Sequence, residues 1–159
     1  MGHALHPKEP KNAVRKWDGK TPYGVHPVWC AMTVLTEELL PESCRIRLSQ
    51  ALLFHDFRED TDDEVPDSVE DGVSALVDEM TFRSSDDEME NLWSRSDETK
   101  LGKLYDKTFN FLDNSWMSDE RKAKHAAHLR RLCDVVQRLY GTLNIVLIAR
   151  GVLHKLDVA

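Results

Sequence analysis

The residues of this chain with the most evident chemistry lie in one short run, residues 53–61, which reads Leu-Phe-His-Asp-Phe-Arg-Glu-Asp-Thr. The adjacent pair His55 and Asp56 is followed one helical turn later by the pair Glu59 and Asp60. Residues four apart share a helix face, so each acid of the second pair would stack beyond a member of the first. An imidazole and a carboxylate can hold a divalent cation, and the later carboxylates could position and deprotonate a water molecule beside it.

Two other segments add groups of the same kind. The upstream segment, residues 22–27, reads Pro-Tyr-Gly-Val-His-Pro and contains His26, and the downstream segment, residues 103–106, reads Lys-Leu-Tyr-Asp and ends at Asp106. Asp106 lies near the middle of an otherwise apolar helical pattern, where an ionised carboxylate is costly unless it is paired or bound to a metal. Asn110, one turn later, adds a polar group on the same stripe.

The candidate metal ligands are therefore His26, His55, Asp56 and Asp106. Two imidazoles and two carboxylates suit Mn²⁺, Fe²⁺ or Zn²⁺, and the lack of thiolates in the set disfavours a structural zinc site. Ordinary structural roles remain open at this point. His55 lies on an apolar stripe and could be a hydrogen-bonded core histidine, and Asp106 could be a buried acid paired with a neighbouring cation, Lys103 or Arg58.

Length and composition predict one domain in a reducing compartment. The 159 residues divide into an N-terminal extension, residues 1–12, and a single domain, residues 13–159. No apolar run is long enough for a membrane span or a signal peptide. The 3 cysteines form no Cys-x-x-Cys pair and cannot all be bridged, so a cytoplasmic location is the simplest expectation.

The charge balance restricts the partners that we expect. Lys and Arg total 21 against 28 Asp and Glu, which gives a formal net charge of −7. Broad nucleic-acid binding requires a basic face and is therefore disfavoured. An anionic substrate would need a bound cation or a local basic cluster.

Hydrophobic periodicity predicts a fold that is all-α. The pattern indicates helices over residues 28–40, 42–57, 67–80, 96–113, 118–140 and 143–156. The acidic stretch 83–90 is expected to be a surface connection or a short helix, with residues 86–88 solvated. His125 and His128, three apart on a predicted helix, are expected to be a solvated pair because no third ligand is evident nearby.

The order His, His-Asp, Asp resembles the HD-domain metal-dependent phosphohydrolases. The surrounding residues are most similar to the hydrolase domain of the guanosine tetra/pentaphosphate (alarmone) enzymes. That group has Arg-Lys before Pro-Tyr-x-x-His-Pro, then His-Asp-x-x-Glu-Asp-Thr, then Lys-Leu-x-Asp-x-x-x-Asn. The matching residues here, over about residues 13–140, are Arg15, Lys16, Pro22, Tyr23, His26, Pro27, His55, Asp56, Glu59, Asp60, Thr61, Lys103, Leu104, Asp106 and Asn110.

The resemblance implies a single-domain helical HD bundle that removes the 3′-pyrophosphate of an alarmone. It also implies that His26, His55, Asp56 and Asp106 bind one ion, usually manganese, and that Glu59 and Asp60 serve the attack of water. The expected substrate contacts are Arg15, Lys16, Arg58, Lys103 and Asn110.

Two alternatives stay open beside this interpretation. The metal chemistry could serve a different substrate, as a phosphatase of a nucleoside monophosphate or of NADPH. The chain could also be a helical module that binds a nucleotide or a partner without turnover.

Overall fold

The regular elements of the protein are helices. The computed structural model describes residues 14–56 and 65–157. The elements in chain order are α1 (Val25–Leu35), α2 (Glu42–Phe54), α4 (Val73–Met80), α5 (Ser85–Asn91), the 3₁₀ turn η1 (Leu92–Ser94), α6 (Asp97–Leu112), α7 (Asp119–Tyr140) and α8 (Asn144–Asp157). Over these described ranges no strand forms, and β pairing is limited to an isolated bridge between Val14 and Pro22. The predicted all-α fold is confirmed.

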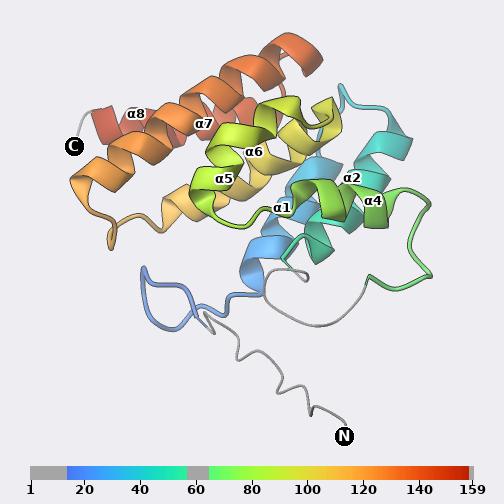
Figure 1. Ribbon diagram of the computed structural model, residues 1–159, viewed down its shortest axis with the longest axis horizontal. Helices are drawn as coiled ribbons and strands as arrows, with labels where there is room; N and C mark the ends of the chain where they lie inside the picture. The colour runs from blue at the N-terminus through green and yellow to red at the C-terminus, as the bar shows by residue number, and fades with distance from the viewer. Residues whose placement is uncertain (1–13, 57–64, 158–159) are drawn as a thin grey trace, which may run out of the picture.

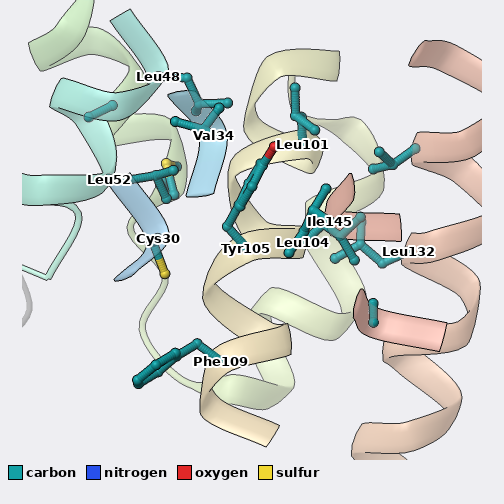
Figure 2. Close-up of a cluster of buried hydrophobic side chains, with 14 of the residues drawn as sticks. Cys30, Val34, Leu48, Leu52, Leu101, Leu104, Tyr105, Phe109, Leu132 and Ile145 are labelled. Carbon is teal, nitrogen blue, oxygen red and sulfur yellow. The ribbon is translucent and has the colours of Figure 1, made fainter. Parts of the chain in front are cut away.

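Helix α6 is the centre of the arrangement and packs against α1, α2, α4, α7 and α8. It begins after Ser96, whose side chain accepts a hydrogen bond from the backbone N–H of Thr99. Most of its residues are buried, as expected for a helix that is apolar nearly all round. Figure 2 shows Tyr105 of α6 on the side of α1 and α2, and Leu104 on the side of α7 and α8. The same layering is visible in Figure 1, where α7 and α8 run along one side of α6.

A glycine in α6 allows one of these contacts to be close. A Cβ added at Gly102 would lie 3.0 Å from Sδ and Cε of Met80 in α4 and 3.2 Å from Cδ1 of Leu48 in α2. A larger side chain there would require the side chains of Met80 and Leu48 to shift. The glycine therefore lets α2, α4 and α6 approach one turn before Asp106.

The first helix differs from its prediction at both ends. It starts three residues earlier than predicted, with Pro27 in its first turn, where a missing N–H breaks no helical hydrogen bond. It ends at Leu35 because the chain then turns and points the buried side chain of Glu37 inward. Glu37 Oε2 accepts the N–H of Asn144 at 2.7 Å, and Oε1 accepts the N–H of Ile145 at 2.9 Å.

Two other predicted helices are also shorter than predicted. Helix α2 ends at Phe54, and residues 57–64 lie outside the described part of the chain. The predicted helix over 67–80 begins only at Val73, because Gly72 before it has φ +85° and is not helical. The acidic stretch does form a short helix, α5, which Ser84 caps by accepting from the N–H of Asp87.

The hydrogen bonds of Glu37 predict a measurable effect on stability. Glu37 also accepts a hydrogen bond from the hydroxyl of Tyr105 at 2.9 Å. A Glu37→Gln variant keeps the shape but leaves a single oxygen as acceptor, so a buried donor loses its partner. We expect the free energy of unfolding to fall by about 1–3 kcal/mol, measured by urea denaturation. The exposed neighbour Glu38 supplies the control, Glu38→Gln. Equal midpoints for the two variants would contradict this role.

Candidate metal centre

Three helices bring the predicted ligands together. His26 lies in the first turn of α1, His55 follows the last residue of α2, and Asp106 lies in the second half of α6. These helices pack against one another, and all three side chains are buried. Residues separated by up to 80 positions in the sequence thus meet at one point in the interior.

The three side chains present their donor atoms to one another. The Nε2 atoms of His26 and His55 are 3.0 Å apart. Oδ1 of Asp106 lies 3.2 Å from Nε2 of His26 and 3.6 Å from Nε2 of His55. One ligand atom from each residue fits within 4.8 Å of the others. Such spacing allows all three to contact one ion at bond lengths of about 2 Å.

Asp56, the fourth predicted ligand, lies at the edge of this group. Its Oδ1 is 3.2 Å from Nε2 of His55, and its Oδ2 is 3.8 Å from Nε2 of His26. The hydroxyl of Tyr23 donates a hydrogen bond to Oδ2 at 2.7 Å. No role for Tyr23 was predicted from the sequence, although it belongs to the segment that carries His26.

Hydrogen bonding and charge make this centre suitable for a cation. Nδ1 of His55 lies 2.7 Å from the carbonyl oxygen of Leu52, which can only accept, so Nδ1 carries the proton and Nε2 faces the centre. Burial opposes the charged form of His55, but the carboxylates of Asp56 and Asp106 outweigh it and raise its pKa to about 9. Burial lowers the pKa of His26. The carboxylates of Asp56 and Asp106 thus favour positive charge at the point where the Nε2 atoms of the two histidines meet.

Asp106 divides its two oxygens between different groups. Oδ1 faces the histidines and accepts a hydrogen bond from Nδ2 of Asn110 at 2.6 Å. Oδ2 lies 3.2 Å from Nζ of Lys103 and 3.2 Å from Nζ of Lys107. Burial raises the pKa of Asp106, but these ammonium groups, with the histidines, lower it well below its usual value. The ion pair between Asp106 and Lys103, which the sequence suggested as an alternative, is therefore present. It uses Oδ2, so Oδ1 still faces the histidines.

Helix α5 supplies a second buried carboxylate behind the lysines. Glu88 is 3% exposed, so the expectation of a solvated face over residues 86–88 is wrong for this residue. Burial opposes its ionisation, but Lys107 and Lys103 outweigh burial and lower the pKa of Glu88 to about 2. The signal that could have located it is the pair of lysines flanking Asp106, which cannot both be neutralised by one acid.

The residue types present fit a divalent ion. Two imidazole nitrogens and one or two carboxylate oxygens are donors typical of Mn²⁺, Fe²⁺ and Zn²⁺ sites. His55 also has the hydrogen-bonded Nδ1 that commonly orients a ligating histidine. Cys30 does not belong to the group. Its Sγ lies 4.0 Å from Nδ1 of His26, whereas the atom of His26 that faces the centre is Nε2.

A cavity of about 250 Å³ lies beside the centre and is lined mainly by cationic and aromatic side chains. The residues of its wall that carry charge or contact the centre are Arg15, Lys16, Tyr23, Lys107, Asn110, Asp113 and Arg121. Nζ of Lys16 lies 3.8 Å from the ring of Trp116, and the guanidinium of Arg121 lies 5.0 Å from it. A basic cavity of this kind is the local cluster that an anionic ligand needs in a chain of net charge −7.

The predicted substrate residues take different positions. Arg15 is buried, with NH1 donating to Oδ1 of Asn110 at 3.2 Å and Nε lying 3.5 Å from Oδ2 of Asp113. Lys16 is exposed at the cavity, and Asn110 lines it. Lys103 lies in the interior, against Asp106 and Glu88. Their contacts with a substrate stay predictions.

The remaining predicted residues are Arg58, Glu59 and Asp60. They fall outside the described residues, so their roles also stay predictions.

The expectation of a solvated histidine pair is wrong for His128. Its side chain is buried, its ring lies 5.5 Å from that of Trp93, and Nε2 is 3.5 Å from Oε1 of Glu88. His125 is half-buried, and both histidines line the cavity. Helix α7 therefore contributes to the same region as α5 and α6.

Comparison with known proteins gives a structural match. Neither a family description nor a curated protein sequence matches the chain. A solved structure described as a metazoan ortholog of SpoT that hydrolyzes ppGpp and plays a role in starvation responses aligns with a TM-score of 0.67. The alignment covers 94% of this chain and 90% of that chain at 23% sequence identity. The two chains share a fold. The similarity agrees with the predicted helical architecture.

Membrane insertion through a helix finds no support in the structure. Among the described residues, every helix is too short or too polar to cross a bilayer.

The buried position of Asp106 predicts that metal binding depends on its charge. Asp106→Asn keeps the size of the side chain but places a neutral amide against the histidines. We expect Mn²⁺ affinity, measured by isothermal titration calorimetry, to fall by at least about 100-fold, since a direct ligand should cost more than its supporting groups. Asp134→Asn, an exposed position on α7, is the control. Unchanged Mn²⁺ binding in the Asp106 variant would exclude this residue as a ligand.

Proposed function

We propose that this protein is a metal-dependent phosphohydrolase that removes the 3′-pyrophosphate of guanosine tetra- or pentaphosphate. The observation that carries the proposal is the meeting of His26, His55 and Asp106 within 4.8 Å, beside a cavity lined by cationic groups. The fold shared with a protein described as hydrolyzing ppGpp supports the choice of substrate class.

The donor set is consistent with one catalytic ion, for which we propose Mn²⁺. His26, His55 and Asp106 would hold it, with Asp56 as the fourth ligand oriented by the hydroxyl of Tyr23. A bound divalent ion would lower the pKa of a coordinated water and neutralise charge that develops on phosphoryl oxygens.

The cavity supports binding of a polyanionic nucleotide. Lys16, Lys107 and Arg121 offer positive charge to phosphate groups, and Trp116 offers an aromatic surface on which a base can stack. Arg15 is anchored by Asp113 and Asn110, so its guanidinium is held at the cavity wall in a fixed orientation. We propose that Lys103 acts on the substrate indirectly, through Asp106.

The reaction would proceed by attack of water on the phosphorus attached to the ribose O3′. The new P–O bond forms as the bond from phosphorus to O3′ breaks, and O3′ gains a proton. The products are the 5′-phosphorylated nucleoside and pyrophosphate. We propose that Glu59 and Asp60, which follow Asp56 closely in the sequence, accept the proton of the attacking water.

Product analysis tests the proposed substrate. The purified chain with added Mn²⁺ should release pyrophosphate from guanosine tetraphosphate, and removal of the ion by a chelator should stop the release. Release of orthophosphate from a nucleoside monophosphate or from NADPH would instead indicate a phosphatase of another nucleotide. No turnover of any nucleotide, with Asp106→Ala without effect, would contradict an enzymatic function.

A substitution at Glu59 separates proton transfer from metal binding. Glu59→Gln removes a base but no proposed ligand, so we expect turnover to fall by about 100-fold or more while Mn²⁺ affinity is unchanged. The two quantities are measured by pyrophosphate release and by titration with Mn²⁺. Asp106→Asn is the contrasting variant, because it should lose both. Loss of the ion from the Glu59 variant would overturn the assigned role.

A further inference from the structure

Glu88 of helix α5 lies at the end of a line of charged groups that leads to the candidate metal centre. Its Oε2 is 2.8 Å from Nζ of Lys107 and 3.2 Å from Nζ of Lys103. Both lysines belong to α6, so the acid joins two helices. Its other oxygen, Oε1, lies 3.5 Å from Nε2 of His128, beyond hydrogen-bonding geometry. The close contacts of Glu88 are therefore those with the two ammonium groups.

The two lysines connect Glu88 with Asp106. Each ammonium group lies 3.2 Å from Oδ2 of Asp106, the oxygen that does not face the histidines. The lysines therefore hold the carboxylate from behind, and Asn110 contacts Oδ1 from the side. With Oδ2 engaged in this way, Oδ1 stays directed at the point where the Nε2 atoms of His26 and His55 meet.

The charges of this group balance only when Glu88 is included. Asp106 and Glu88 contribute two negative charges, and Lys103 and Lys107 contribute two positive charges. Asp106, Glu88 and Lys103 are buried and Lys107 is half-buried, and charges in such positions interact more strongly than in water. Without Glu88, two ammonium groups would share one carboxylate, and the excess positive charge would oppose a dication on its far side.

We propose that Glu88 is a positioning residue of the metal centre, which neutralises Lys103 and Lys107 so that they orient Asp106 without repelling the bound ion. The proposal rests on the metal centre described under the proposed function. It also assigns a role to one acid of α5, Glu88, where the sequence predicted a solvated surface.

A purely structural salt bridge between α5 and α6 makes a different prediction. Loss of such a bridge would lower stability whichever partner is removed, and it would not depend on the net charge near Asp106. A charge-balancing role instead predicts opposite effects on metal affinity, since removal of Glu88 adds positive charge and removal of Lys107 subtracts it.

The test compares Mn²⁺ affinity among variants of the full chain, measured by titration with detection of free Mn²⁺ by electron paramagnetic resonance. For Glu88→Gln we expect affinity to fall by about 10- to 100-fold, the usual effect of losing a group that supports a metal ligand. Glu90→Gln, an exposed position on the same helix, should bind as the unmodified chain does. The double variant Glu88→Gln/Lys107→Met restores the charge balance and should recover most of the lost affinity.

The single variant Lys107→Met keeps the proposal testable even if Glu88→Gln does not fold. Lys103 still holds Oδ2 of Asp106 in this variant, and one positive charge is gone, so it should bind Mn²⁺ at least as tightly as the unmodified chain. A loss of affinity in Lys107→Met comparable to that expected for Glu88→Gln would overturn the charge-balancing role. Unchanged affinity in a folded Glu88→Gln variant would overturn it as well.

The two proposals fail in different ways. An unmodified chain that binds no divalent ion would contradict the metal centre and, with it, the role of Glu88. An unmodified chain that binds Mn²⁺ while Glu88→Gln binds equally well would contradict only the role of Glu88.

Discussion

A carboxylate buried in the central helix is the constraint on which the site depends. Asp106 is 2% exposed in the central helix α6, and an ionised acid is stable there only if its charge is compensated. Lys103 and Lys107 compensate it on one side, and they in turn require Glu88 from α5. The histidines of α1 and α2 face its other oxygen. The compensation of the charge of Asp106 thus involves residues at α1, α2, α5 and α6.

The same group connects the centre with the cavity. Asn110 donates to Asp106 and accepts from Arg15, which forms a hydrogen-bonded path from the cavity wall to the candidate ligand. Lys107 contacts Asp106 and also lines the cavity. Positive charge is therefore concentrated beside two acidic groups in a chain that is acidic as a whole. Such a separation of charge would favour the binding of a polyanion next to a cation.

The positions of the helices followed from hydrophobic periodicity, but several of their ends did not. Periodicity records which residues face the core, and it located each of the long helices. The early end of α1 depends on Glu37, whose partners are backbone N–H groups more than 100 residues away. The late start of α4 depends on the conformation of Gly72. Neither a contact between distant residues nor the conformation of a single glycine produces a periodic pattern in the local sequence.

The sequence by itself determined the kinds of ligand and their order along the chain, because residue type sets which atoms can bind a cation. It therefore predicted that His26, His55, Asp56 and Asp106 would meet. In the described geometry His26, His55 and Asp106 do so, and Asp56 lies at their edge. Only the tertiary structure decided that Glu88 is buried, that Arg15 is anchored by Asn110, and that Tyr23 orients Asp56. These are contacts between separate elements. Spacing along a chain defines which residues share a helix face, whereas the packing of helices defines which faces meet.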